Sequence, residues 1–149
     1  VDELDTLFNK RSGMMGLTGF GDLREVHRLV EEGNEDAKLA LDIYVHRIVG
    51  YIGNYTAQMG GVDVITFTAG VGENDDVVRK MVCDKLAPFG VKLDEKKNAT
   101  RSKEPRIIST PDSAVTICVI PTNEELAIAR KSAAIAEEGK DSYGNVFSK

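Results

Sequence analysis

Apolar residues recur along this chain at the three- and four-residue steps that are typical of helices. The longest such stripe predicts a helix from Asn34 to about Met59, and Val49 and Tyr51 widen its apolar side. A helix that is apolar over so much of its circumference is expected to be mostly buried. The same spacing predicts further helices at residues 2–9, 23–32, 75–87 and 124–138.

Two shorter apolar runs, at residues 63–69 and 115–120, predict buried strands, because they are rich in β-branched residues and too short for helices. Each run is followed by a predicted helix, so we expect the two strands to lie parallel in one sheet. The predicted fold class is therefore α/β. Two long strands make a thin sheet. Either the short candidates at residues 91–93 and 106–110 widen it, or its central strands come from sequence outside this chain.

Glycines separate several of these elements. Residues 11–21 contain four glycines and predict a shaped or flexible loop. Gly70 and Gly72 predict a turn with positive φ between a strand and a helix, and Asn74 or Asp75 is the candidate N-cap of that helix. A strand, a glycine turn and a helix N-terminus form a common site for nucleotides. The same pattern also occurs as a plain tight connection.

Composition narrows the class of protein. A chain of 149 residues fits one domain, which we expect at residues 1–139, with a loose tail at 140–149. The net charge of −5 argues against a nucleic-acid-binding surface, and the absence of an apolar run of about 18 residues predicts no membrane span. Cys83 and Cys118 have no metal-ligand spacing and indicate free thiols of a cytoplasmic protein. Because the chain begins at Val1 and enters at once on a helical pattern, we expect a piece of a longer protein.

Three segments together closely resemble the C-terminal part of the acetate kinase family. They are Lys10–Gly19 with Asp22–Arg24, Phe67–Asn74, and Val119–Ala129, and they occur in the family's order and at about its spacing. The resemblance covers residues 1 to roughly 137. It implies a ribonuclease-H-like lobe of the actin, Hsp70 and sugar kinase superfamily, with an incomplete sheet in this chain.

The resemblance also implies which residues bind ligands. The family's nucleotide contacts fall on Asp22, Leu23 and Arg24, and on Gly70, Val71, Gly72, Glu73 and Asn74. Its magnesium-linked carboxylate falls on Glu124, so the implied ligands are ATP or ADP and Mg²⁺.

Each of these residue types also has a plainer explanation. Asp22 is a good helix N-cap, Arg24 fits a solvated charge paired with Asp22 or Glu25, and Glu124 fits the preference of helix starts for acids. The two histidines, His27 and His46, have no partner at a catalytic spacing, so we expect neither of them to be catalytic. The resemblance places the family's catalytic residues outside this chain.

The implied function is the nucleotide-binding portion of an acetate kinase, which transfers the γ-phosphoryl group of ATP to acetate. The family's catalytic aspartate, its two arginines and its histidine fall upstream of Val1, so the isolated chain is expected to be inactive and acetate to bind through the missing portion. A propionate or butyrate kinase portion and a non-catalytic nucleotide-binding or assembly module remain alternatives. The resemblance further implies a homodimer, while the net charge and the lack of a long apolar run predict neither nucleic acid nor membrane as a partner.

Overall fold

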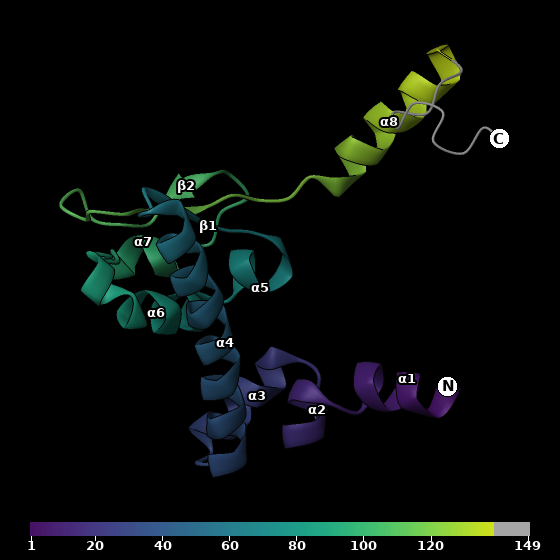
Figure 1. Cartoon of the computed structure of the whole chain (residues 1–149), viewed down its shortest axis with the longest axis vertical. Coiled ribbons are helices and arrows are strands. Elements are labelled where there is room, and N and C mark those ends of the chain that lie inside the picture. Colours follow the sequence, from purple (N-terminus) through teal and green to yellow (C-terminus); the bar gives the residue numbers. More distant parts are fainter. Residues whose placement is uncertain (139–149) are drawn as a thin grey trace.

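The computed structural model describes residues 1–138 and consists of a long central helix with two groups of elements along it (Figure 1). Helices α2 and α3 pack along one part of the central helix, whereas α1 extends away from it, and a small sheet with its helices lies along the other part. The elements are α1 (Asp2–Lys10), α2 (Gly13–Thr18), α3 (Leu23–Glu31), α4 (Glu35–Met59), β1 (Val64–Phe67), α5 (Ala69–Asn74), α6 (Asp76–Lys85), the 3₁₀ helix η1 (Ala87–Phe89), α7 (Glu95–Ala99), β2 (Arg106–Ile107), β3 (Thr116–Val119) and α8 (Glu124–Glu138).

The central helix α4 has the ends that the sequence predicts. Asn34 caps its start, because the Asn34 side chain accepts a hydrogen bond from the Ala37 N–H, and Gly60 ends it in the left-handed conformation with φ +74°. Its burial is less complete than predicted. Only positions in its first half are fully buried, whereas Tyr51 and Tyr55 are about half exposed at 51% and 54%. The expectation of a mostly buried helix was therefore wrong for its second half, because no described element covers that side.

The sheet confirms the parallel pairing expected of its two long strands. β3 lies in the centre, pairs with β1 in parallel and with the short strand β2 in antiparallel, and matches Val64 with Thr116 and Phe67 with Val119. β1 is an edge strand, and Val64 is 54% exposed. The prediction that β1 is a buried strand was wrong, because one of its edges and part of its surface have no neighbour among the described residues.

The hydrophobic core lies on one face of this sheet. Inward-facing residues of β3, such as Ile117 and Val119, are fully buried, while the alternate positions Thr116 and Cys118 are only partly covered. The same core takes in Val26 of α3 and Val82 of α6, together with the first half of α4. Helices α3, α4 and α6 are thereby packed together, and the chain segments between them are held in place.

Two segments for which the sequence predicts no helix contain helices. The glycine-rich stretch 11–21 forms α2, and the lysine-rich stretch after Leu93 forms α7, where Asp94 caps the helix by accepting a hydrogen bond from the Lys97 N–H. The strand predicted at 91–93 is reduced to a single bridge between Leu93 and Ser109. Both cysteines are free, as expected, with Cys83 buried and Cys118 partly buried.

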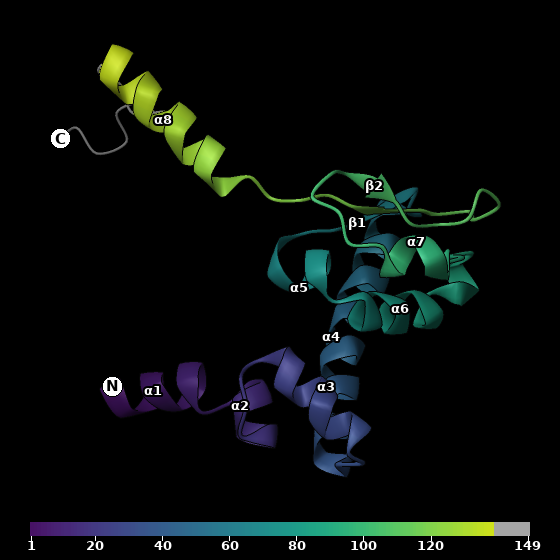
Figure 2. The same ribbon diagram turned by 180° about the vertical axis from the view of Figure 1, so that it is seen from behind.

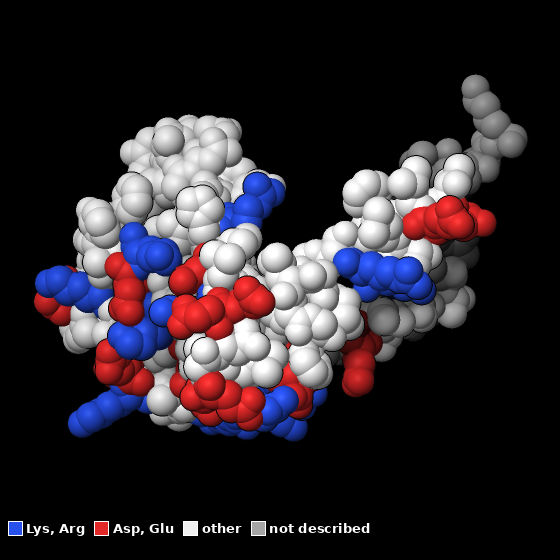
Figure 3. Space-filling view, turned by 90° about the horizontal axis from the view of Figure 1, so that it is seen from below, with Lys and Arg blue, Asp and Glu red and all other residues white. Residues whose placement is uncertain are grey.

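The last helix, α8, has the bounds predicted for it and extends away from the body of the molecule (Figures 1 and 2). The predicted tail at 140–149 lies outside the described residues. Within residues 1–138 no helix is both long and apolar enough to cross a membrane. On the face seen in Figure 3, lysine and arginine side chains lie among acidic ones and form no continuous basic patch.

Candidate functional site

A large cavity joins two segments that are distant in the sequence. It has a volume of about 1010 Å³ and lies where the start of α3 meets α5; we call it the α3–α5 cavity. Six of the nine residues singled out from the sequence line it, and the lining residues are Gly13, Met14, Gly21, Asp22, Leu23, Arg24, Tyr44, Gly70, Val71, Asn74, Asp75 and Arg101. The fold therefore brings the Asp22–Arg24 segment and much of the Gly70–Asn74 segment to one site.

Asp22 both caps α3 and pairs with Arg24. One carboxylate oxygen accepts a hydrogen bond from the Arg24 N–H at 2.9 Å, and the Arg24 Nε lies 3.0 Å from the same oxygen. The hydrogen bonds from the Arg24 side chain, followed by that from its backbone N–H, lower the pKa of Asp22 to about 2. The Arg24 side chain is 89% exposed. It is therefore held near the cavity by Asp22 and is free to contact a ligand from solvent.

The segment Gly70–Asn74 is a short helix and not the glycine turn that the sequence predicts. Gly70 and Gly72 do not adopt positive φ; the change of direction after β1 is made by Ala69, with φ +59°. An L-residue in this region is strained by about 1–2 kcal/mol. Asn74 ends α5 and donates a hydrogen bond to the Gly70 carbonyl at 2.8 Å. Asp75, the other candidate, caps α6 by accepting a hydrogen bond from the Val78 N–H.

The lack of a side chain has a different consequence at each of the two glycines of α5. A Cβ at Gly72 would lie 3.1 Å from the backbone carbonyl carbon of Phe67, so only glycine lets α5 fold back on the end of β1 without strain. A Cβ at Gly70 would meet nothing within 4 Å. Gly70 instead leaves open backbone beside the α3–α5 cavity, where another molecule can approach closely.

Glu73 does not line the α3–α5 cavity. Its carboxylate accepts hydrogen bonds from the Thr122 N–H at 2.8 Å and from the Thr122 hydroxyl at 3.0 Å, and the first of these lowers the pKa of Glu73. Glu73 thereby links α5 to the segment that precedes α8. The nucleotide contact predicted for Glu73 stays a prediction.

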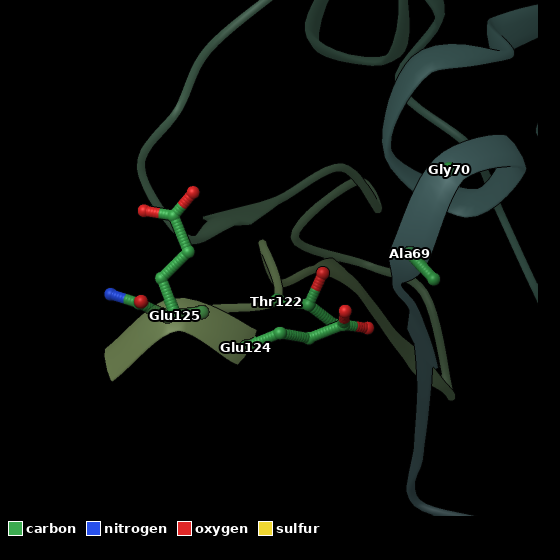
Figure 4. Close-up of a pocket in the computed structure, with 6 residues that line it drawn as sticks. Ala69, Gly70, Thr122, Glu124 and Glu125 are labelled. Atoms are coloured by element: carbon green, nitrogen blue, oxygen red, sulfur yellow. The ribbon is translucent and has the colours of Figure 1, made fainter. Parts of the chain in front are cut away.

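A second, smaller cavity of about 450 Å³ lies at that junction, between α5 and the start of α8; we call it the α5–α8 cavity. Gly70 lines it as well as the α3–α5 cavity. Figure 4 shows the Glu124 side chain extending toward the start of α5, whereas the Glu125 carboxylate points in another direction. The side chain of Asn123 accepts a hydrogen bond from the Leu126 N–H and so caps α8.

Glu124 is the candidate metal ligand, and among the described residues it is not part of a cluster of metal-binding side chains. Residues 1–138 contain no group of three or more His, Cys, Asp or Glu side chains that could hold a metal ion. Mg²⁺ keeps several waters and is usually bound through one or two carboxylates together with substrate phosphates. A single carboxylate in an open cavity fits that mode of binding, and it does not fit a metal held by the protein alone.

Two further residues line the α3–α5 cavity that sequence reasoning does not identify. Tyr44 belongs to the apolar stripe of α4, yet it lines the cavity, and burial together with the negative charge of Asp75 raises its pKa. Arg101 follows α7 and also lines the cavity. Neither residue belongs to a motif, so only the tertiary structure reveals them.

A buried arginine supports α5 from behind. Arg79 of α6 is 2% exposed and donates hydrogen bonds to the Gly72 carbonyl at 2.9 Å and to the side-chain and backbone oxygens of Asn98, both at 2.7 Å. Burial lowers the pKa of Arg79. All three acceptors are neutral, so the buried charge of Arg79 is stabilised by these hydrogen bonds and not by a salt bridge.

Comparison with known proteins relates this chain to one family of enzymes. The sequence model of the Acetokinase family matches residues 1–130. Acetate kinase of Leifsonia xyli subsp. xyli is 54% identical over 132 residues, and acetate kinase of Desulfotalea psychrophila is 53% identical over 135 residues. These matches cover 89% and 91% of this chain and 33% of each relative. The chain therefore spans about a third of the length of the curated relatives it matches.

Solved structures agree with the sequence match. The crystal structure of Porphyromonas gingivalis acetate kinase aligns with a TM-score of 0.81 and 42% identity, over 91% of this chain and 34% of that chain. Acetate kinase from Entamoeba histolytica aligns with a TM-score of 0.83 and 31% identity, over 88% and 36%. A propionate kinase from Francisella tularensis gives 0.78 and 39%, over 87% and 33%. The α/β fold with an incomplete sheet is thus a portion of the fold of these kinases.

Proposed function

We propose, because this chain belongs to the acetokinase family, that it forms the nucleotide-binding portion of an acetate kinase. In the complete enzyme the γ-phosphoryl group of ATP would pass to acetate and give acetyl phosphate and ADP. The observation that carries this proposal is the α3–α5 cavity, where Asp22–Arg24 and Gly70–Asn74 meet.

The walls of this cavity suit the nucleoside end of ATP or ADP. Leu23, Tyr44 and Val71 are partly buried and supply apolar contacts for a purine. Arg24 and Asp22 at the rim supply a planar cation, which stacks on or hydrogen-bonds to a base, and a carboxylate that accepts hydrogen bonds from ribose hydroxyls. Open backbone at Gly70 lets the nucleotide lie against α5.

The phosphate end of the nucleotide would extend past Gly70 into the α5–α8 cavity, since Gly70 lines both cavities. Glu124 would there meet Mg²⁺, directly or through water, with the phosphates supplying most of the remaining ligands. When bound, Mg²⁺ neutralises phosphate charge during phosphoryl transfer. The contribution of this chain is to orient the nucleotide and to present one carboxylate.

No reacting group is proposed within residues 1–138. Phosphoryl transfer depends mainly on positioning and on electrostatic stabilisation of the transferring group. We therefore expect the isolated chain to bind nucleotide without turnover. A coupled assay that detects ATP- and acetate-dependent turnover by the isolated chain would contradict this.

Acetate is the proposed acyl substrate because the curated relatives at 50–54% identity are named acetate kinases. The propionate kinase structure, at 39% identity, keeps a propionate-specific enzyme as the second candidate. Activities of a full-length enzyme containing this chain, measured with acids of increasing length, distinguish the two.

A homodimer is part of the same proposal. The second half of α4 presents a large apolar side that the described residues leave open, including Tyr51, Tyr55 and Met59. A second copy of the protein would cover it. Two free cysteines fit the reducing cytoplasm, where we propose that the enzyme acts. Sedimentation of the full-length protein as a monomer would contradict the dimer.

Titration calorimetry with ADP and Mg²⁺ tests the nucleotide site. We expect the folded chain to bind ADP, and Arg24→Ala to weaken binding by about tenfold, the loss typical of a charged hydrogen bond. Arg28→Ala is the matched control, because Arg28 is on the same helix and pairs with Glu25 and Glu32. A folded chain without ADP affinity, or equal affinities of Arg24→Ala and the unchanged chain, would overturn the proposal.

A further inference from the structure

His27 and Asp75 make a direct side-chain contact that the sequence does not reveal. The Nε2 atom of His27 lies 2.7 Å from an Oδ2 oxygen of Asp75, across a separation of 48 residues. The two side chains are only 21% and 13% exposed. A carboxylate can only accept a hydrogen bond, so His27 carries a proton on Nε2 and donates it.

This contact joins the two halves of the α3–α5 cavity. His27 is on α3, one turn after Asp22 and Arg24, and Asp75 follows α5 directly and lines the cavity. Among the described residues it is the hydrogen bond that connects α3 with the segment 69–76. Val26 and Val78 also lie in one hydrophobic core, but apolar packing leaves the relative setting of the two helix ends less defined than a directional bond does.

Both carboxylate oxygens of Asp75 have a hydrogen-bond partner. Its Oδ1 oxygen accepts a hydrogen bond from the Val78 N–H at 2.9 Å and so caps α6, while its Oδ2 oxygen binds His27. The start of α6 and the end of α5 are therefore fixed to α3 by one carboxylate. Its negative charge also acts on Tyr44 in the cavity wall.

We infer that His27 and Asp75 are a positioning pair, which holds the Asp22–Arg24 segment against α5 and thereby sets the affinity for the adenine nucleotide. The inference rests on the proposed nucleotide site and adds two residues to it that need not touch the ligand. Because the pair acts as a unit, losing either member should remove the same contribution to affinity.

Calorimetric titration of the 149-residue chain with ADP and Mg²⁺ tests the pair. The variants are His27→Ala, Asp75→Ser, which keeps an N-cap for α6 but is too short to reach His27, and the double variant. His27→Gln supplies an N–H donor at a position similar to Nε2. The matched control is His46→Ala, because His46 is exposed on α4 and lines neither cavity.

We expect His27→Ala and Asp75→Ser each to weaken ADP binding by about tenfold, the double variant to bind no more weakly than either, and His27→Gln to restore most of the affinity. His46→Ala should bind like the unchanged chain. A merely structural role would lower the unfolding temperature without this non-additive pattern in affinity. If His27→Ala does not fold, Asp75→Ser and His27→Gln decide.

Unaltered affinity of the folded variants, or additive losses in the double variant, would overturn the positioning pair and leave the nucleotide site standing. Failure of the folded, unchanged chain to bind ADP would overturn both. The two failures are thus told apart by the unchanged chain alone.

Discussion

At the scale of single residues, Asp22 shows how one side chain serves the helix and the site together. Its hydrogen bonds with the Arg24 side chain, and then its cap on the Arg24 backbone N–H, favour the ionised carboxylate, which is why its pKa falls from 3.8 to about 2. Since the folded-state pKa lies below the unfolded value, the interaction stabilises the fold above pH 3.8 and is lost as the pH falls toward 2.

NMR titration of the carboxyl carbon of Asp22 should therefore give a pKa of about 2. Arg24→Ala should raise it toward 3.8 but not fully, because the backbone N–H of residue 24 still donates to the carboxylate. Asp112 is the internal control, since its pKa is lowered to about 2 by Lys92 and should not respond to Arg24→Ala. An Asp22 pKa that is unmoved in the variant would contradict this account of the pair.

The two glycines of α5 give a second prediction. Gly72→Val should destabilise the chain by about 1–3 kcal/mol, because the new side chain must push against the backbone of Phe67. Gly70→Ala should leave stability unchanged or slightly raised, since its Cβ meets open space in a helix. Urea unfolding measures both. Equal losses for the two variants would show that α5 does not pack on β1 as described.

At the scale of elements, the buried contact between Arg79 and Asn98 ties α6, α7 and α5 together. Asn98→Ala removes the acceptor of the Arg79 Nε and the donor to the Asp76 carbonyl. We expect a loss of about 2–3 kcal/mol in the free energy of unfolding, because a buried charged donor is left without its acceptor. Asn54→Ala, at an exposed position of α4, is the control and should be nearly neutral. A neutral Asn98→Ala would mean that water or another group replaces the amide.

The elements themselves were largely predictable where local signals are strong. The long helix, its caps Asn34 and Gly60, and the last helix have the bounds that periodicity and capping residues indicate. The glycine-rich stretch 11–21 predicts a loop, although Met14, Leu17 and Thr18 allow a turn of helix there. In the same way the sequence of α5 predicts a glycine turn, because nothing local shows that Ala69 adopts the left-handed conformation and that Gly72 packs on Phe67.

At the scale of the whole molecule, the exposed apolar surface was beyond prediction from periodicity. The apolar pattern of α4 and β1 predicts that these elements are buried. Tyr51, Tyr55 and Val64 are nevertheless about half exposed, because the described elements leave part of their surface uncovered. The relatives, of which this chain spans about a third, are long enough to supply the missing contacts. An apolar pattern tells which side is buried, but it does not tell which part of a protein or of an assembly covers it.

The motif residues of the candidate site could be predicted from the sequence, whereas the residues that support them could not. Motif resemblance singled out Asp22–Arg24 and Gly70–Asn74, and the fold brings most of them to the α3–α5 cavity. The residues that support the site without belonging to a motif, His27 with Asp75 and Arg79 with Asn98, are brought together only by the tertiary fold. Sequence separation hides such pairs.

A crystal structure of the chain with ADP and Mg²⁺ would decide whether the α3–α5 cavity holds the nucleoside of an adenine nucleotide. We predict electron density for the purine and ribose between the Arg24 side chain and the backbone at Gly70, with the phosphates directed toward Glu124. Density for ADP at another surface, or a cavity closed by the chain's own side chains in the presence of bound ADP, would contradict it.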